Sequence, residues 1–172
     1  GIFKNKVAKK DIKSILNFAK KNNINYLDTA NDYGQFDKKL YKVIKKFKIF
    51  KKFDLNSSAF RNISNQNIKR LKQKKLRQYS CFGLTLRQPN ILLKAKGRRF
   101  FKILNHLRNK GFIKKIGISI YCTADLKKII KNFKIDYIQV PLNIVNKKVY
   151  QSTKNIIKKR KIEIHVRSVF LQ

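Results

Sequence analysis

The stretch Asn25–Gly34, Asn-Tyr-Leu-Asp-Thr-Ala-Asn-Asp-Tyr-Gly, decides the fold. The apolar run Ile24–Leu27 predicts a short strand that ends at Asp28, and the chain then leads through Tyr33 into a helical pattern. A carboxylate at the mouth of a strand, with a tyrosine five residues later, suits proton transfer. The alternative is a polar turn in which the aspartate caps a helix.

Strand and helix patterns alternate along the whole chain. The first helical pattern covers about Lys9 to Lys21, where apolar residues recur at helical spacing. Apolar runs predict strands at Ile24–Leu27, Phe53–Ser57, Tyr79–Leu86, Ile116–Ile120, Tyr137–Val140 and Ile162–Val166. Alternation at this spacing indicates βα units, a parallel sheet and right-handed crossovers.

Two architectures fit this alternation, an open doubly wound sheet and a TIM-type barrel. Polar residues follow the predicted strands at their carboxyl ends: Asp28, Ser58, Arg87, Ser119, Gln139 and Ser168. In a barrel these ends form one ring around one mouth. A doubly wound sheet usually binds its ligand over a Gly-rich first turn, and the sequence has neither G-x-G-x-x-G nor a P-loop. We therefore expect a partial (β/α)8 barrel of about six parallel strands, in a single domain over residues 1–172.

The charge is extreme, with 44 Lys and Arg against 8 Asp and Glu and a net charge of +36. Such a field attracts phosphate polymers and acidic surfaces. The lysines occur in nearly every segment, which favours a solvated and compositionally biased surface over a dedicated nucleic-acid site. We expect nucleic acid to bind only non-specifically, through net charge.

Several classes of protein are disfavoured. No apolar run approaches the roughly 20 residues that a membrane helix needs, and no signal peptide is visible. Cys81 and Cys122 do not make a disulfide framework, which predicts a cytoplasmic protein. His106 and His165 complete no metal-ligand cluster. The sequence contains no Met, so we expect a fragment or a processed product.

Four segments carry a family likeness. Leu27–Ala30 followed by Tyr33-Gly34 resembles the D-T-A-x-x-Y-G signature of the aldo-keto reductases. Lys110–Ser119 is similar to their "lysine-glycine, then I-G-V-S" segment. Ile138–Asn143 is similar to their "I-Q-x-x-Y-N" segment, and Val166–Gln172 is similar to the "R-S-x-F-L-Q-G" segment of a bacterial subgroup. In family terms the chain begins after the first barrel strand and ends after the seventh, so strands one and eight are expected to be absent.

The resemblance implies an oxidoreductase. In this family a hydride from NADPH, or from NADH, goes to the carbonyl carbon of a small carbonyl or sugar-like substrate. The resemblance makes Tyr33 the group that protonates the oxygen. A phenol has an unperturbed pKa near ~10, so it needs help at neutral pH. The family supplies a lysine paired with the aspartate, here Asp28, and a histidine that orients the carbonyl.

Both helpers are expected to be missing. Ala59 stands where the lysine is expected, and Arg87 stands in place of the histidine. Lys51 and Lys52 are expected at the wrong end of their strand. The charge of Arg87 can lower the pKa of Tyr33, but arginine cannot act as a neutral histidine would. We therefore expect impaired activity.

The resemblance also implies a cofactor site. Ser119 and Gln139 match positions that hold the nicotinamide carboxamide, although ordinary strand-end capping is the alternative. Arg167 and Ser168 match the region under the nicotinamide and pyrophosphate. Ile120 departs from the asparagine often found at its position. Two other hypotheses stay open, a catalytically silent remnant that binds a nucleotide or a partner, and a basic nucleic-acid-binding protein.

Overall fold

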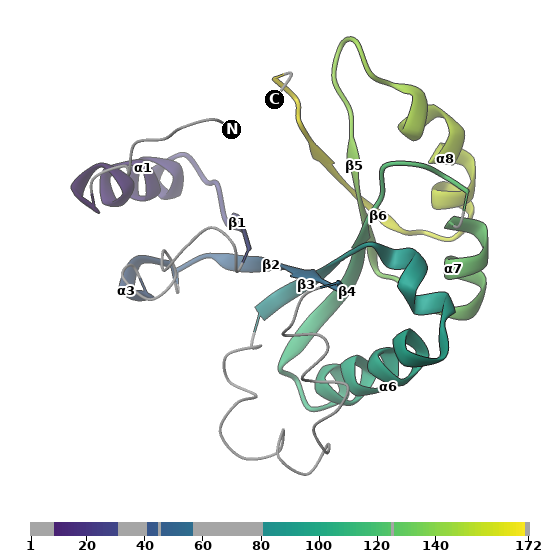
Figure 1. The fold of residues 1–172 in the computed structure, drawn as a ribbon. Helices are drawn as coiled ribbons and strands as arrows, with labels where there is room; N and C mark the ends of the chain where they lie inside the picture. The colour runs from purple at the N-terminus through teal and green to yellow at the C-terminus, as the bar shows by residue number, and fades with distance from the viewer. Residues whose placement is uncertain (1–8, 31–40, 45, 57–80, 125, 171–172) are drawn as a thin grey trace.

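The sheet has six parallel strands in the order β1-β2-β3-β4-β5-β6, curled into half of a barrel (Figure 1). The computed structural model describes residues 9–30, 41–44, 46–56, 81–124 and 126–170. The strands are β1 (Tyr26–Ala30), β2 (Lys48–Asp54), β3 (Cys81–Arg87), β4 (Ile113–Ser119), β5 (Tyr137–Pro141) and β6 (Glu163–Arg167). The predicted partial TIM barrel is confirmed.

Helices cover the convex side of the sheet (Figure 1). They are α1 (Lys9–Lys21), α3 (Tyr41–Ile44), the 3-10 helix η3 (Pro89–Leu93), α6 (Ala95–Asn109), α7 (Leu126–Asn132) and α8 (Lys148–Lys159). The bounds of α1 are those predicted from apolar spacing. The basic segment 90–97 forms the end of η3 and the start of α6. Pro89 begins η3 because its fixed φ suits the first turn of a helix.

The core lies between the sheet and these helices. Side chains alternate along each strand, so one face of the sheet packs on the helices and the other lines the barrel interior. Ile116 and Ile118 of β4 and Ile138 of β5 face the helices and are fully buried. A smaller cluster under α1 includes Leu16 and Phe47. The central strands β3 and β5 are buried on both faces and are accordingly the most apolar.

Aromatic rings line the concave face. The Tyr137 ring lies where a Cβ on Gly117 would meet it at 2.3 Å, so only glycine fits beside it. The Tyr137 hydroxyl is 2.6 Å from Thr85 Oγ1, and burial raises the pKa of Tyr137 above its usual value. His165 stacks on Tyr137 with a centroid distance of 4.5 Å. The Tyr26 ring is 55% exposed and meets Phe50 edge-on, with the ring centroids 5.7 Å apart.

The second strand differs from its predicted position. It was expected at Phe53–Ser57 and lies instead at Lys48–Asp54. Lysines interrupt the apolar pattern of this segment, so the pattern matched neither a buried strand nor a clean alternation. This correction matters because it brings Lys52 close to the carboxyl end of the sheet.

Candidate functional site

The site is built around Asp28 and Lys52, which face each other across the first two strands. Asp28 lies in β1 and Lys52 in β2, and the register pairs Ala30 with Lys52, so both side chains point to the concave face. Lys52 Nζ is 2.5 Å from Asp28 Oδ2. The lysine side chain is 12% exposed and the aspartate 39% exposed. The Asp28 carboxylate therefore fixes the Lys52 ammonium group on the concave face of the sheet.

Lys52 corrects the expectation that the lysine helper is missing. The prediction that Lys51 and Lys52 lie at the wrong end of their strand is wrong, because β2 ends only at Asp54. Ala59, which was assigned to the lysine position, lies outside the described residues. The cation expected beside Asp28 is present, and it comes from β2. No clean apolar alternation marked this strand in the sequence, because Lys51 separates Ile49 from Phe53 on the outward face.

Gln139 joins the pair from the opposite side of the half-barrel. Its Nε2 donates to Asp28 Oδ2 at 3.2 Å, although the two residues are 111 positions apart. Ser119 lies directly opposite Gln139 in the pairing of β4 with β5, and both side chains are 4% exposed. Gln139 Oε1 is buried and accepts no hydrogen bond from the residues that the structure describes. This oxygen is therefore an available acceptor at the site.

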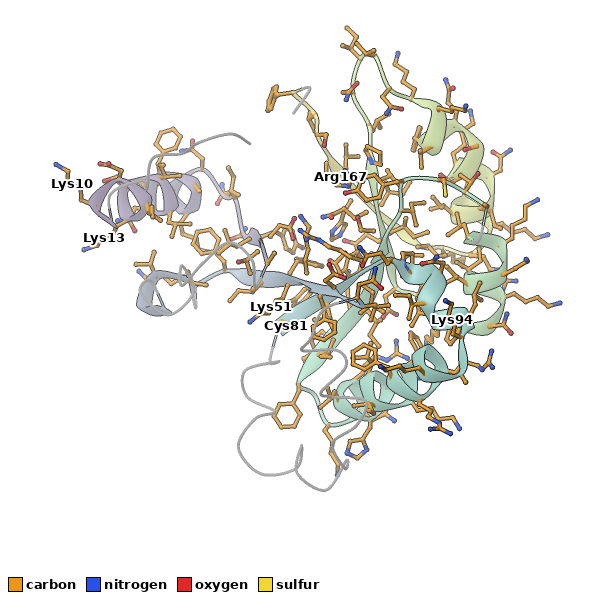
Figure 2. The ribbon with its side chains drawn as sticks, viewed as in Figure 1. Lys10, Lys13, Lys51, Cys81, Lys94 and Arg167 are labelled. Carbon is orange, nitrogen blue, oxygen red and sulfur yellow. The ribbon has the colours of Figure 1, made fainter. Side chains whose placement is uncertain are left out.

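Arg167, labelled in Figure 2, is the last residue of β6, and it lines the same cavity as Asp28 and Gln139. Its guanidinium carbon lies 3.9 Å from the centroid of the Tyr121 ring, and Nη2 is 3.4 Å from the Ile120 carbonyl oxygen. Its Nε is buried and has no hydrogen-bond partner within the described part of the chain. Arg167 thus adds positive charge and one available donor.

Ser168 shapes the turn after β6. Its φ is 56°, a left-handed conformation that residues other than glycine rarely adopt. The Ser168 carbonyl oxygen accepts a hydrogen bond from Asn143 Nδ2 at 3.0 Å. The Asn143 side chain also accepts hydrogen bonds from the backbone amides of Val145 and Asn146, at 3.0 and 2.7 Å. One asparagine therefore ties the loop after β5 to the end of β6.

Two predicted site residues are placed less closely. Arg87 is the last residue of β3 and is half-buried, with Asp54 opposite it in the pairing of β2 with β3. Tyr33 lies outside the described residues. The structure therefore brings together Asp28, Ser119 and Gln139, and it leaves the proton donor implied by the resemblance untested.

A cavity of about 390 Å³ opens beside this group. Asp28, Gln139 and Arg167 line one part of it, and Tyr26, Phe50 and His165 line another. Charged and amide groups thus meet an aromatic wall in one hollow. A fixed ammonium group and free hydrogen-bonding atoms beside an apolar wall suit the binding of a planar polar molecule and the stabilisation of negative charge on oxygen.

A second polar cluster on the concave face was not predicted. Glu163 of β6 accepts hydrogen bonds from Lys115 of β4 and, at 2.9 Å, from His165 Nε2. Burial acts to raise the pKa of Glu163, but the hydrogen bonds and charges of these two partners outweigh it and hold the pKa below its usual value. The cluster joins β4 to β6. No sequence motif marks it, since its members belong to strands 48 residues apart.

Other chemistries find little support among the described residues. The part of the chain that the structure describes contains no group of three or more His, Cys, Asp or Glu side chains suited to a metal ion. Within the same residues, no helix is long and apolar enough to cross a membrane. Burial raises the pKa of the Cys81 thiol to about 12, which keeps it protonated, and Cys122 is exposed and unpaired.

Comparison with known proteins agrees with this geometry. A model of the aldo/keto reductase family matches residues 1–172. A protein of Pseudomonas aeruginosa assigned to the aldo-keto reductases has a similar fold, with a TM-score of 0.71 and 17% identity. The holo form of an aldo-keto reductase from Bacillus halodurans gives 0.70 and 17%, and an aldose reductase of Giardia lamblia gives 0.65 and 13%. No curated protein sequence matches the chain.

The matches cover this chain more fully than they cover the relatives. They span 98%, 95% and 94% of this chain but only 68%, 57% and 62% of the three solved chains, in the order given. The chain therefore spans about three fifths of the length of these structures.

Proposed function

Because the chain belongs to the aldo/keto reductase family, we propose that it is an NAD(P)H-dependent oxidoreductase that interconverts a carbonyl group and an alcohol. The observation that supports this most is the Asp28–Lys52 ion pair, to which Gln139 also donates a hydrogen bond. A small carbonyl compound or a sugar-like alcohol is the proposed substrate. We also propose a cytoplasmic location, which two unpaired cysteines favour.

Lys52 is proposed to help a tyrosine exchange protons. An ammonium group near a phenol favours the phenolate and so lowers the pKa of the phenol from its unperturbed value near ~10. Asp28, which lines the cavity, pairs with Lys52 and holds its ammonium group on the concave face. Tyr33, five residues after Asp28, is the proposed proton donor to the carbonyl oxygen.

The residues present fit a nicotinamide cofactor. A carboxamide offers an N–H donor and a carbonyl acceptor, and Gln139 Oε1 is a buried acceptor that no described residue occupies. Ser119 lies directly opposite and adds a hydroxyl. Arg167 Nε is a buried donor with a positive charge, which suits a phosphate. The cofactor, when bound, supplies a hydride.

Arg87 is proposed to orient the carbonyl group. Its guanidinium has donors only and stays charged at all working pH values, so it can hold an oxygen but cannot accept a proton from it. A permanent cation at this position stabilises the alkoxide, but it cannot relay a proton, so Tyr33 must regain its proton without help from Arg87. We therefore expect turnover that is slower than a histidine would allow.

The rival hypothesis is a silent protein that binds a nucleotide without turning it over. It predicts the same cofactor contacts, because Gln139 and Arg167 serve binding in both cases. The two differ at Tyr33 and Lys52, which matter only when a proton moves.

Binding and turnover are measured separately. NADPH and NADH are titrated by cofactor fluorescence at moderate salt, and oxidation of NADPH is followed with a panel of aldehydes and ketones. We expect micromolar binding, turnover with at least one carbonyl, and a loss of at least a hundredfold in turnover for Tyr33→Phe with binding retained. Binding without turnover by the folded wild type supports the silent protein, and no binding at all contradicts both.

A further inference from the structure

The convex side of the half-barrel carries a surface made of lysine and arginine. Helices α6, α7 and α8 cover the neighbouring strands β3 to β6 on this side, and nitrogen-tipped side chains extend outward from them (Figure 2). Their exposed cations are Lys96, Arg98, Arg99, Lys102, Lys127, Lys128, Lys131, Lys148, Lys154, Lys158 and Lys159. We call this set the basic face.

No acidic residue balances the basic face from within its own helices. The sequences of α6, α7 and α8 contain neither Asp nor Glu. Two of the described acids, Asp28 and Glu163, point to the concave face, where Lys52 and Lys115 neutralise them. Asp136 lies beneath the helices, 3.0 Å from Arg108 Nη1. These three acids therefore serve internal contacts, and none of them lies among the exposed cations of the basic face.

The spacing of these cations costs stability when no anion is bound. Side chains four positions apart on a helix are neighbours, and like charges at that spacing repel each other. Lys127 and Lys131 of α7 are such a pair, and so are Lys154 and Lys158 of α8. A phosphate bound between two such lysines attracts both of them and so offsets the repulsion between their charges. The arrangement thus suits a polymer of negative charges better than isolated ions.

Large exposed apolar side chains are missing from the basic face, and this narrows the class of partner that it can bind. Among the described residues, the large apolar side chains that are exposed lie on α1, on β1 and β6, and in the loops before β1 and after β4, β5 and β6, and none lies on α6, α7 or α8. Binding to a membrane surface adds apolar insertion to charge, and single-stranded nucleic acid is held by stacking on aromatic rings. Neither contact is offered here. A nucleic-acid duplex keeps its bases stacked inside and its phosphates outside, so binding its backbone needs neither apolar insertion nor aromatic stacking.

We propose that the basic face binds the phosphate backbone of duplex nucleic acid without sequence preference. A helix of the length of α8 extends about 18 Å, and packed helices lie about 8–10 Å apart, so three of them span on the order of five phosphates. The face is on the opposite side of the sheet from the cavity with Asp28 and Gln139. The proposal is thus independent of the oxidoreductase activity.

The test compares two variants that lose the same charge. The basic-face variant carries Lys127→Gln, Lys131→Gln, Lys154→Gln and Lys158→Gln. The matched control carries Lys10→Gln, Lys13→Gln, Lys21→Gln and Lys46→Gln, four exposed lysines in α1 and next to α3. Fluorescence anisotropy measures the binding of two unrelated 20-base-pair DNA duplexes from 50 to 300 mM NaCl, and circular dichroism checks that each variant is folded.

We expect equal affinity for both duplexes and a slope of log K against log salt near about −4, as for four to six phosphate contacts. The basic-face variant should lose at least tenfold in affinity and flatten the slope by about 3, and the control should lose less than threefold. Equal losses in both variants would assign binding to net charge alone and overturn the proposal. Absence of binding at 50 mM NaCl, or tighter binding to phosphatidylserine vesicles than to DNA, would overturn it as well.

Discussion

At the scale of single residues, Asp28 is the organising group, because it receives a cation from β2 and an amide from β5. Lys52 Nζ and Gln139 Nε2 both approach Asp28 Oδ2, at 2.5 and 3.2 Å. The second contact also fixes the orientation of the glutamine, since its amide nitrogen faces Asp28 and its oxygen is left as an acceptor. One carboxylate therefore positions both the ammonium group and the free amide oxygen to which we assign the proposed roles in proton transfer and cofactor binding.

Replacing Arg87 with histidine should raise activity. A neutral imidazole donates from one nitrogen and accepts at the other, and its pKa near 6.5 allows it to exchange a proton at neutral pH. We expect Arg87→His to raise kcat for an aldehyde about tenfold or more, measured by NADPH oxidation under saturating cofactor. Ala59→Lys is the companion variant and should give no gain, because Lys52 already pairs with Asp28. A gain at Ala59 and none at Arg87 would reverse our assignment of both positions.

Lys52 also shows what the sequence did not reveal. Asp28, Ser119 and Gln139 were predicted because each follows an apolar run, and strand ends of a parallel sheet converge on one rim. Lys52 belongs to a strand whose inward positions are lysine, phenylalanine and lysine, so no apolar run marks its end. Its partner is 24 positions away in the chain, and only the pairing of β1 with β2 brings the two together.

At the scale of the elements, Tyr137 locks three strands together. Its ring occupies the space that a Cβ would need at Gly117, and its hydroxyl bonds to Thr85 across β3. Gly117 and Thr85 lie opposite each other in the pairing of β3 with β4, so the tyrosine covers both. Tyr137 therefore packs on β3 and β4 from the concave side, with the rings of Phe50 and His165 against it.

Gly117→Ala should destabilise the sheet. A methyl group there would lie 2.3 Å from a buried ring, and relieving such overpacking costs typically about 1–3 kcal/mol. Urea unfolding followed by circular dichroism measures the loss. Ile118→Val, which removes one methyl group from the next residue, sets the scale of an ordinary core change at about 0.5–1.5 kcal/mol. A loss at Gly117 that is no larger than the loss at Ile118 would contradict the packing described.

Glu163 makes stability depend on pH. Its pKa is held below the usual value in the folded protein by Lys115 and His165. Its ionised form therefore stabilises the fold above the unfolded-state pKa, and this contribution is lost as the pH falls through the lower, folded-state value. We expect the difference in unfolding free energy between wild type and Glu163→Gln to shrink as the pH falls from 6 towards 3. A difference in unfolding free energy that does not change with pH would mean that the ionised Glu163 side chain does not stabilise the fold.

At the scale of the whole molecule, alternation of strand and helix was enough to predict the architecture. Six parallel strands with connecting helices follow from apolar spacing and from the handedness of βα units. The strand bounds shifted by two or more residues at several positions, because residues near strand ends such as Thr29, Lys48 and Lys114 carry little apolar signal. The pairing of Glu163 with Lys115 depends on curvature of the sheet, which no local pattern encodes.

The net charge of +36 should make stability rise with salt. Like charges repel in the compact state, and ions shorten the range of that repulsion from about 30 Å at 0.01 M to about 8 Å at 0.15 M. We expect the midpoint of thermal unfolding to rise by several degrees between 10 and 300 mM NaCl, measured by circular dichroism. A midpoint that falls with salt would mean that attractive pairs, such as Asp28 with Lys52, outweigh the repulsion.

The most direct test of the central claim is deuteride transfer from 4-deuterated NADPH to an aldehyde, followed by mass spectrometry of the alcohol. We expect wild type to deuterate the product, Lys52→Met to do so at least a hundredfold more slowly, and Lys51→Met, on the opposite face of β2, to stay within twofold of wild type. Folded wild-type protein that transfers no deuterium, or a Lys52→Met variant as fast as wild type, would contradict the claim that the Asp28–Lys52 pair supports carbonyl reduction.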